Sequence, residues 1–329
     1  MAVLVTGGAG YIGSHMVLRL ADAGEDVVVL DNLTTGFDWA VDPRAALVTG
    51  NAGDMAFVGD LIRQRGITEI VHFAGSIVVP ESVANPLKYY ANNTATSRNL
   101  IEAAVTNGVK HMVFSSTAAV YGMTGLEPVS EETVLNPMSP YGRSKLMTEM
   151  MLADVAAAHP LTYGALRYFN VAGADPKRRS GQSSPTATHL IKVACQAALG
   201  QRDHVDIFGT DYPTPDGTGV RDYIHVTDLV EAHALLLAYL RSGGKSTTMN
   251  CGYGTGYSVR QVIDMVRQVS GVDFEARQAP RRAGDPPAIV ASAEKVRAVL
   301  GWQPAHDDLE EIVGSAYAWE QYLRTRNRQ

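Results

Sequence analysis

Hydrophobic and polar residues follow one another along the first half of the chain in the pattern of alternating strands and helices. Short runs of β-branched and other apolar residues are separated by stretches in which apolar residues recur every three or four positions, the period of an amphipathic helix. Strands are predicted at Ala2–Thr6, Val27–Leu30, Ala46–Thr49, Glu69–Phe73, His111–Ser115 and Thr162–Arg167, and helices near 11–23, 54–65, 92–107 and 141–158. This alternation predicts an α/β fold whose first domain, residues 1–170, is a doubly wound parallel Rossmann sheet.

After residue 170 the pattern becomes less regular. Segments rich in Gly, Pro, Ser and charged residues predict long surface loops at Asp175–Pro185, Thr210–Thr218 and Ala279–Pro287. The stretches between these loops predict a second, smaller α/β domain over residues 171–329 that binds the substrate. A strongly helical stretch, Val226–Leu240, precedes the short strand Thr248–Cys251, so we expect the chain to return to the first domain at about 222–251.

The first predicted strand runs into Gly7, Gly10 and Gly13 and then into the first predicted helix. The N–H groups in the first turn of a helix have no partner within the helix, and the helix dipole favours an anion beside them. Glycines allow the tight turn and the close approach of the backbone to a diphosphate. Asp31 ends the next apolar run, 18 residues after Gly13, about where a carboxylate binds the ribose of a dinucleotide. Because this carboxylate would repel the 2′-phosphate of NADP, we predict NAD as the cofactor.

The amino-acid composition and net charge limit the kinds of partner that the protein is expected to bind. Of the 329 residues, 46% are hydrophobic and 19% are charged, and the formal net charge is −6, which argues against nucleic-acid and membrane partners. We expect neither a secretion leader nor a membrane span, because no charged leader precedes the first strand and no apolar run reaches about 18 residues. Cys195 and Cys251 are too few for a disulfide framework or a four-ligand zinc site, so we expect free buried thiols, a cytoplasmic protein and no metal.

Tyr141 and Lys145 lie four residues apart at the start of a predicted helix, and this spacing puts both side chains on one helical face. A phenol loses its proton near pH 10 and is therefore a poor base at neutral pH. A neighbouring ammonium group and a nicotinamide cation both favour the phenolate and lower its pKa. The same spacing also arises by chance, but here it follows the fifth predicted strand of a nucleotide-binding sheet. We therefore expect Tyr141 to act as a base.

Residues that directly follow the predicted strands should meet at the carboxyl edge of the sheet, where ligands bind. These are Gly7, Asp31, Phe73–Gly75 and Ser115–Thr117. The Thr117 hydroxyl can bond the substrate oxygen whose proton Tyr141 takes, or it can instead satisfy the backbone at the end of its own strand. Hydride transfer and a tyrosine base together predict reversible oxidation of a secondary alcohol.

Longer motifs carry a resemblance to a known family. They are GGAGYIGSH, HFAG, FSSTAAVYG, SPYGRSK, LRYFNVAGA, IFGTDYPTPDGTGVRDYIHVTDL and APRRAGDPPA. Together, over nearly the whole chain, they resemble the UDP-glucose 4-epimerases of the extended short-chain dehydrogenase/reductase family. The resemblance implies an NAD-dependent, redox-neutral isomerase of a UDP-sugar. In this family the base removes the 4-hydroxyl proton, NAD takes the C4 hydride, and the 4-keto sugar turns so that the hydride returns to its other face.

The resemblance also assigns residues to the two ligands. It makes Tyr141 the base, Lys145 its electrostatic partner and ribose anchor, and Thr117 the hydroxyl partner. The cofactor residues that it implies are Gly7, Gly10, Tyr11, Ile12, Gly13, Asp31, Asn32, Asn51, Ala52, Phe73, Ala74, Gly75, Asn92, Ser115, Tyr141, Lys145 and Tyr168. The substrate residues that it implies are Thr117, Tyr141, Phe169, Asn170, His189, Leu190, Phe208, Arg221, Tyr223, Arg282, Asp285 and Ile289.

Among these substrate residues, Arg221 and Arg282 are expected to hold the diphosphate of UDP, Asp285 the uridine ribose, and Phe208 the uracil. The residues themselves support the arginines independently. Arg281, Arg282 and Arg221 lie in loops rich in Gly and Pro in an otherwise acidic chain, and the guanidinium group suits phosphate. Single arginines of this kind are equally often solvated surface residues.

Related enzymes on the same scaffold are separated from an epimerase by the residues after Thr117. Resembling dehydratases have Asp-Glu there, because removing water needs an additional acid and base, and decarboxylating relatives keep a Glu. This chain has Ala118 and Ala119, which cannot transfer protons. A nucleotide-sugar dehydrogenase, which would release the reduced cofactor after oxidising its substrate, remains an alternative function, because side chains do not reveal whether the cofactor is released. A non-catalytic dinucleotide sensor is disfavoured by the intact Thr117, Tyr141 and Lys145.

Some positions depart from the family pattern. Ser76-Ile77 stands where many relatives have a lysine near the cofactor phosphates, and Asn51 stands where an aspartate commonly contacts adenine, so we expect weaker retention of NAD. Ile289 is the position that gates N-acetylated sugars: tyrosine excludes the acetamido group and a small residue admits it. With isoleucine we expect UDP-glucose and UDP-galactose as substrates and weaker activity on N-acetylated sugars. A UDP-pentose remains an alternative substrate. The sequence does not show how His189, which stands where other members of the family have an asparagine, affects the choice of sugar.

Members of this family are usually homodimers joined by two helices of each subunit. The predicted helix 92–107 and the helix that starts at Tyr141 are the candidates here. Small residues such as Ala95, Ala103 and Ala104 permit close packing of helices, but they equally suit the core of a monomer. The scattered His72, His111, His189 and His225 lack the spacing of a metal site and are interpreted as structural or pocket-lining.

Overall fold

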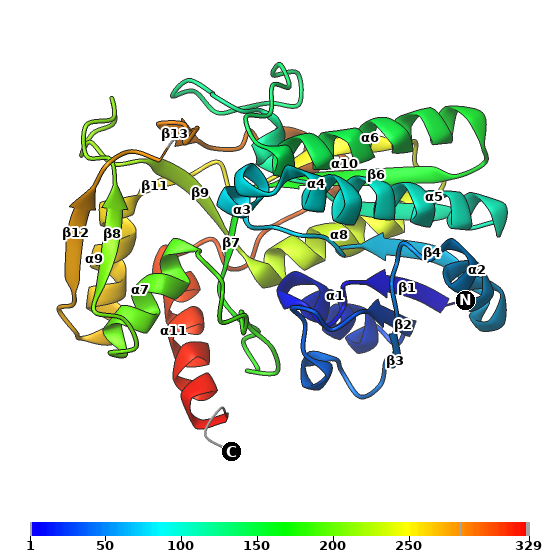
Figure 1. Cartoon of the computed structure of the whole chain (residues 1–329), viewed down its shortest axis with the longest axis horizontal. Coiled ribbons are helices and arrows are strands. Elements are labelled where there is room, and N and C mark those ends of the chain that lie inside the picture. The colour runs from blue at the N-terminus through cyan, green and yellow to red at the C-terminus, as the bar shows by residue number, and fades with distance from the viewer. Residues whose placement is uncertain (1, 283, 327–329) are drawn as a thin grey trace.

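The computed structural model describes residues 2–282 and 284–326 and is built around one parallel sheet. Seven strands form this sheet, and every pair is parallel. In order across the sheet they are β10 (Thr247–Cys251), β6 (Thr162–Tyr168), β5 (His111–Ser115), β4 (Ile67–His72), β1 (Ala2–Thr6), β2 (Asp26–Asp31) and β3 (Ala46–Thr49) (Figure 1). The predicted doubly wound Rossmann fold is therefore confirmed.

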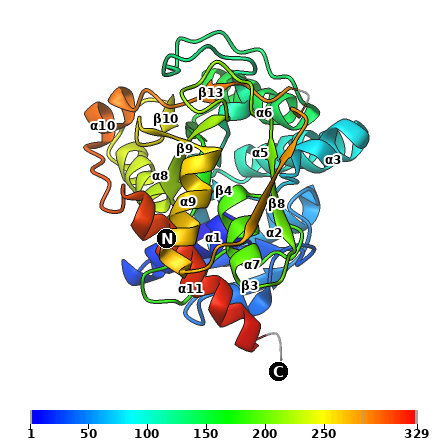
Figure 2. The same cartoon turned by 90° about the vertical axis from the view of Figure 1, so that its left-hand side faces the viewer.

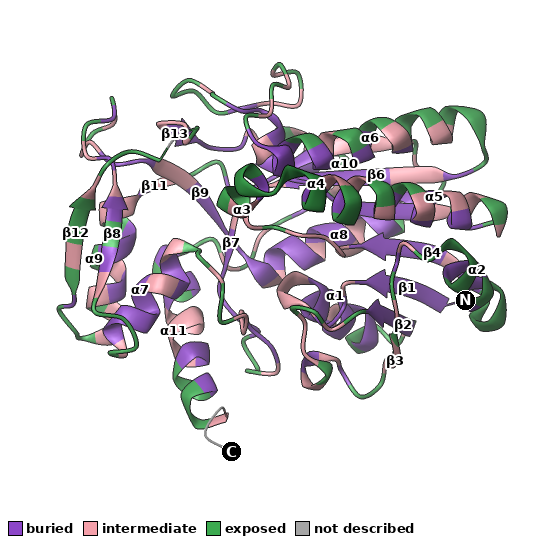
Figure 3. Ribbon diagram, viewed as in Figure 1, coloured by how far each residue is buried: buried purple, intermediate pink, exposed green. Residues whose placement is uncertain are grey.

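Helices cover both faces of the sheet because its strands are apolar on both faces. Side chains alternate along β1: Val3 and Val5 pack with α1 (Tyr11–Asp22) and α8 (Val226–Arg241), whereas Leu4 faces the other layer. That second layer consists of α2 (Met55–Arg65), α5 (Thr96–Thr106) and α6 (Pro140–Ala158). Figure 3 shows the strands buried between these layers and exposed residues along the outer sides of α2 and α6. The sheet edge that carries the loops is thus held rigidly from both sides.

The predicted elements of the first half agree with the structure, with one informative exception. The bounds of β1, β3 and β5 are those predicted, and α1, α2 and α6 each lie within one or two residues of the prediction. The helix predicted near 92–107 is divided, because the short α4 (Pro86–Tyr89) leads into a wider π-helical turn, η2 (Tyr90–Ala95), before α5 begins. Such π-turns often mark functional sites. Two further short elements, α3 (Val79–Ala84) and the 3₁₀ turn η3 (Ala118–Val120), also border the sheet edge.

A second lobe lies beyond the carboxyl ends of the strands (Figure 1) and stands in front of the sheet when the molecule is viewed from that end (Figure 2). Its sheet pairs β9 (Val220–His225) with β7 (Asn170–Ala172), β11 (Gly256–Ser258) and β13 (Ala288–Ile289), and a separate pair joins β8 (His204–Phe208) to β12 (Glu275–Ala279). Its helices are α7 (Leu190–Ala198), α9 (Val259–Ser270) and α11 (Leu309–Arg326). The sequence reading named no helix after Leu240, yet the apolar residues of α9 recur at helical spacing, so its pattern contained the signal. The predicted loops Asp175–Pro185 and Thr210–Thr218 contain no helix or strand.

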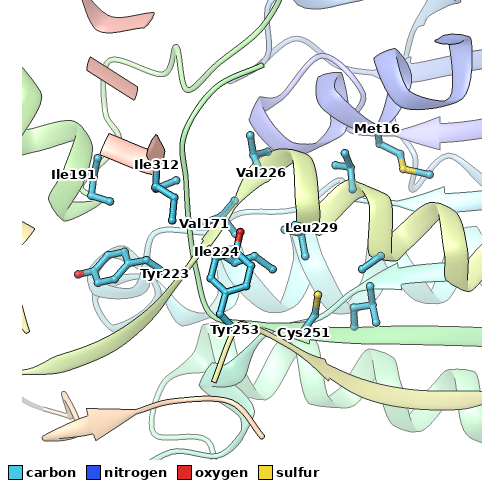
Figure 4. Packing of buried hydrophobic residues seen from close by; sticks show 14 of the residues in the cluster. Met16, Val171, Ile191, Tyr223, Ile224, Val226, Leu229, Cys251, Tyr253 and Ile312 are labelled. Carbon is cyan, nitrogen blue, oxygen red and sulfur yellow. The ribbon is translucent and has the colours of Figure 1, made fainter. Parts of the chain in front are cut away.

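The chain returns to the first sheet after building part of the second lobe. Helix α8 packs on the sheet, and β10 pairs in parallel with β6 at its edge, while α10 (Glu294–Leu300) packs on α8 and β10. One buried apolar cluster runs from Met16 and Leu229 beside the sheet to Ile191 and Ile312 in the second lobe (Figure 4). A continuous core therefore joins the two parts, while the proposed division at residue 170 stays a prediction.

Candidate active site

A cleft of about 2090 Å³ separates the carboxyl edge of the first sheet from the second lobe. Sites for one drug-sized ligand span roughly 300–1,000 Å³, so this cleft has room for two ligands side by side. Every residue predicted above for the cofactor or the substrate lies on its wall, from Gly7 at the first strand to Ile289 in β13. The structure therefore brings together residues from the whole length of the chain, as expected for an open α/β sheet, whose ligands bind beyond the carboxyl ends of its strands.

The glycine-rich turn after β1 forms a tight cradle at one end of the cleft. Gly7 has a φ of +71°, which disfavours other residues, and a Cβ on Gly13 would lie 2.1 Å from the Gly7 carbonyl oxygen. Helix α1 begins at Tyr11, and its N-cap residue, Gly10, provides no side-chain cap. Tyr11, Ile12 and Gly13 line the cleft, so the first N–H groups of α1 are available to an anion. This geometry fits the diphosphate of a dinucleotide.

Asp31 is placed beside this cradle and is only 8% exposed. Its Oδ2 accepts a hydrogen bond from the Ala9 N–H at 3.0 Å, and its Oδ1 accepts one from the Leu33 N–H at 2.8 Å. The carboxylate therefore links the end of β2 to the glycine-rich turn. Because it also lines the cleft, its remaining lone pairs can accept from the hydroxyls of a ribose. The donor set and the missing Cβ atoms together fit NAD.

Helix α6 positions the two residues predicted for proton transfer. The Ser139 hydroxyl accepts from the Gly142 N–H at 3.1 Å and caps the helix, so that Tyr141 and Lys145 lie in its first two turns on one side. Both face the cleft, and Tyr141 is 7% exposed. Thr117 lies two residues after the end of β5, and its Oγ1 accepts from the Ala119 N–H at 3.2 Å. The threonine thus satisfies the backbone, which was the alternative stated above, and its hydroxyl also acts to lower the pKa of the Tyr141 phenol.

The electrostatics of this trio differ from the sequence-based expectation. Burial raises the pKa of the Tyr141 phenol above its ordinary value, and the hydrogen bond with Thr117 opposes this only in part. Lys145 was expected to lower that pKa, but its ammonium group donates instead to the Ser115 carbonyl at 2.9 Å and lies 4.9 Å from the centre of the Phe114 ring. Burial lowers the pKa of Lys145 to about 8, so its charge depends on its surroundings. The local protein environment alone therefore keeps Tyr141 protonated.

On the second lobe the structure distinguishes the arginines that the sequence treated alike. Arg282 lies over the Phe208 ring, 3.7 Å from its centre, and both line the cleft. Arg281 points elsewhere: it donates to the Asp211 carboxylate at 2.7 Å and is 4.2 Å from the Tyr212 ring centre. It is therefore occupied in holding its own loop.

Ile289, the position expected to gate N-acetylated sugars, lies next to Arg221. Ile289 of β13 pairs in register with Arg221 of β9, and both residues line the cleft. One Nη of Arg221 donates to the Val220 carbonyl at 2.8 Å, which leaves its other donors for a ligand. Ile289 packs with Ala118 and Phe169 in a small apolar cluster. The size of the Ile289 side chain therefore affects the shape of the cleft wall near Thr117.

Asn93 is a buried residue that supports the cleft wall, and the sequence analysis did not identify it. It is buried in the π-helical turn, where its Oδ1 accepts from the Ser76 N–H at 2.7 Å and its Nδ2 donates to the Ser76 carbonyl at 3.0 Å. The same Nδ2 also donates to the Ser144 hydroxyl on α6. Asn93 therefore fixes the cleft wall relative to α6. The available signal was an asparagine at a buried position of a helical pattern, which requires a polar partner.

The positions that depart from the family pattern also line the cleft. Ile77 is 50% exposed there, whereas the neighbouring Ser76 hydroxyl accepts from Asn92 at 2.8 Å. The Asn51 side chain accepts from the Gly53 N–H at 2.8 Å and so shapes a turn of the cleft wall. The cleft therefore presents an apolar side chain at the position where many relatives have a lysine.

Two of the scattered histidines have structural roles, whereas His189 lines the cleft. His72 is buried and bonds Thr6 at 2.7 Å and Ser97 at 2.9 Å, and His225 accepts at the start of α8. Within residues 2–282 and 284–326, no group of three or more His, Cys, Asp and Glu side chains is placed to hold a metal ion. Both cysteines are free and buried. No helix in that part of the chain is long and apolar enough to cross a membrane.

Known proteins share this arrangement. Residues 3–252 match the model of the NAD dependent epimerase/dehydratase family. The curated UDP-glucose 4-epimerase of Azospirillum brasilense is 55% identical over 321 residues, covering 98% of this chain and 92% of that protein. The crystal structure of the Brucella ovis UDP-glucose 4-epimerase in complex with NAD has a TM-score of 0.93 at 41% identity, covering 96% and 97% of the two chains. That of the Bifidobacterium longum enzyme in complex with NAD⁺ and UDP has a TM-score of 0.92 at 36% identity, covering 98% of each.

Proposed function

The chain belongs to the NAD dependent epimerase/dehydratase family, and from this premise we propose that it interconverts UDP-glucose and UDP-galactose by NAD-dependent epimerisation at C4. The observation that carries the proposal is the convergence of Thr117, Tyr141 and Lys145 on a cleft that also holds the glycine-rich cradle. Ala118 and Ala119 follow Thr117 in the same wall. Because neither can transfer a proton, the site supports redox chemistry at C4 without dehydration.

NAD, when bound, supplies the acceptor for the C4 hydride and the donor that returns it. The protein's part is proton transfer and orientation. Tyr141 takes the 4-hydroxyl proton and later gives it back, while the Thr117 hydroxyl bonds the same sugar oxygen. The Lys145 ammonium group places a positive charge near the phenol. Its N–H groups can also donate hydrogen bonds to the ribose of the cofactor. Since burial opposes the phenolate, positive charge in the cleft has to offset that cost before Tyr141 acts as a base.

The remaining cleft residues divide between the two ligands. The N–H groups after Gly10 are proposed to hold the cofactor diphosphate and Asp31 the adenosine ribose. Arg221 and Arg282 are proposed to hold the UDP diphosphate, because guanidinium groups bind phosphate through several parallel N–H donors. Further substrate contacts are proposed for Phe169, Asn170, His189, Leu190, Phe208, Tyr223 and Asp285, and further cofactor contacts for Asn32, Asn51, Ala52, Phe73, Ala74, Gly75, Asn92, Ser115 and Tyr168.

A simple incubation tests the function. The purified protein with UDP-galactose, first alone and then with NAD, is expected to form UDP-glucose without accumulating NADH. Stoichiometric NADH would instead identify a dehydrogenase. Tyr141→Phe removes the transferable proton but keeps the ring, so we expect a loss of about 10²–10⁴-fold in kcat with NAD and UDP binding retained. A Tyr141→Phe variant with undiminished turnover would overturn the assignment of the base.

The assembly is a separate proposal. We infer a homodimer through α5 and α6, supported by the exposed Met147 (40%) and Met150 (59%) on α6 and Leu87 (77%) on α4. Ala103 and Ala104 give no support, because both are buried in the core of the subunit. Sedimentation equilibrium that finds a monomer at micromolar concentration would contradict this proposal. The free, buried cysteines support a cytoplasmic location, where thiols stay reduced.

A further inference from the structure

A buried ion pair lies directly beneath the catalytic residues. Glu149 on α6 and Arg167 on β6 each have side chains only 6% exposed, and Arg167 Nη2 donates to Glu149 Oε2 at 2.6 Å and Nε donates to Oε1 at 3.0 Å. The Ser116 hydroxyl donates to the same carboxylate. Arg167 also donates to the Tyr121 hydroxyl at 3.1 Å. The carboxylate is thus held by a fixed set of donors, which leaves it little freedom to move.

This carboxylate is connected to the catalytic groups in two ways. Ser116, which it anchors, stands between Ser115, whose carbonyl accepts from Lys145, and Thr117. Glu149 also lies one helical turn beyond Lys145, on the same side of α6, where side chains are roughly 5–6 Å apart at Cβ. The pair therefore fixes the end of β5 and at the same time places a negative charge close to the lysine.

Several other groups surround Lys145, but they do not replace that charge. His72 on β4 is buried and neutral, and its pKa is lowered to about 3 by burial and by Lys145 itself. Tyr141 on α6 and Tyr168 on β6 are phenols whose pKa burial raises. Burial lowers the pKa of Lys145, and the carboxylate of Glu149 acts in the opposite direction. Arg167 offsets part of this charge through its ion pair with Glu149. Among these groups, Glu149 is the one that favours the protonated form of Lys145.

Stability alone is a weak reason for such a pair. Removing two charges from water costs about as much as their attraction returns, and well-packed apolar residues commonly serve equally well. We propose that Glu149 is a positioning residue of the reaction, which acts through Lys145 by sustaining its ammonium charge and through Ser116 by holding the strand end that carries Thr117. The proposal rests on the proposed function, since it assigns Lys145 a charged role in turnover.

Glu149→Gln tests the proposal because it keeps the shape and removes the charge. A unit charge about one helical turn away, at an effective dielectric constant of about 20, moves a pKa by roughly one to two pH units. Activity is lost as pH rises through the pKa of Lys145, so the alkaline limb of the kcat profile is expected to move to lower pH by that amount. Acetylation of Lys145, followed against pH by mass spectrometry without any substrate, is expected to show the same displacement.

Matched variants separate this role from simple destabilisation. Glu320→Gln breaks another buried pair, Lys192–Glu320, whose side chains are also 6% exposed, and is expected to leave the alkaline limb and the acetylation midpoint in place. Glu149→Asp keeps the charge and is expected to keep both midpoints, even if kcat falls. If Glu149→Gln does not fold, the neutral double variant Glu149→Gln/Arg167→Gln avoids an unpaired buried charge. Because it removes a cation together with the carboxylate, it is expected to show a smaller displacement in the same direction.

The proposal is overturned if the midpoints of the kcat profile and of Lys145 acetylation in Glu149→Gln, or in the double variant, are the same as in the parent protein and in Glu320→Gln. The proposed function fails in a different way, namely when the parent protein does not convert UDP-galactose. The acetylation midpoint is measured without turnover, so it tests the charge relation between Glu149 and Lys145 in either case.

Discussion

Gly13 is the position at which an added methyl group should do most damage to the cofactor cradle. In Gly13→Ala the new Cβ would lie 2.1 Å from the Gly7 carbonyl oxygen, 2.8 Å from the Gly7 carbonyl carbon and 2.9 Å from the Gly8 Cα. All of these are backbone atoms, so no flexible side chain can yield. Reaching the ordinary contact distance of 3.4 Å requires the start of α1 to separate from the turn after β1 by about 1.3 Å.

That displacement has two measurable consequences. Overpacking of this kind costs about 1–3 kcal/mol of the free energy of unfolding. A misplacement of about 1 Å in a binding group costs about 10²-fold, and for the N–H groups of α1 this corresponds to about 2.7 kcal/mol of NAD binding. In Gly10→Ala the methyl group would lie 3.3 Å from the Gly7 oxygen, so neighbouring atoms need to shift by only a few tenths of an ångström and the loss of affinity should stay below about tenfold.

Gly314→Ala is the matched control. Gly314 also lies in a helix, α11, but a Cβ there meets nothing within 4 Å, so the substitution should raise the free energy of unfolding by about 0.5–1 kcal/mol. Urea unfolding gives the stability, and isothermal titration gives the dissociation constant of NAD. If Gly13→Ala binds NAD as tightly as Gly314→Ala does, the diphosphate is not held at the start of α1 and the cofactor has been placed wrongly.

Three other substitutions test other parts of the site and of the fold. Ile77→Lys should slow NAD dissociation several-fold, because it adds a cation to the apolar part of the cleft wall; Ile77→Met is its neutral control, and equal rates in a dialysis assay would refute the reasoning. Ile289→Ala should raise kcat/KM for UDP-N-acetylglucosamine about tenfold relative to UDP-glucose, because it enlarges the gate, and an unchanged ratio would mean that the gate lies elsewhere. Asp22 accepts hydrogen bonds from Arg44 and Arg179, which lower its pKa from 3.8 to about 2. Asp22→Asn should therefore cost less than about 1 kcal/mol at neutral pH, because the groups are exposed, and the difference should vanish in urea titrations as pH falls from about 4 to 2, where the parent carboxylate becomes protonated.

Much of the fold and of the candidate site follows from local sequence, because local rules determine it. The glycine-rich turn needs missing Cβ atoms at fixed spacing, and Tyr141 and Lys145 share a helical face at any i, i+4 separation. Contacts between distant segments are different. Arg167 and Glu149 read as ordinary residues of a strand and a helix until the packing of α6 on β6 brings them together. The pKa of Tyr141 follows from burial in the folded cleft, which its own neighbours in sequence do not reveal.

The return of the chain to the first sheet bears on how the protein is made. Strand β10 pairs with β6 from Thr247–Gly164 to Cys251–Tyr168. During synthesis, the backbone groups along this edge of β6 therefore stay unpaired until the segment ending at Cys251 has left the ribosome. Part of the second lobe, including β9, is synthesised before that point. A nascent chain released early would expose an unpaired strand edge, the kind of surface that recruits other chains into aggregates. The order of synthesis therefore makes completion of the nucleotide-binding sheet a late event, and the stretch between β6 and β10 is where the nascent protein is most vulnerable.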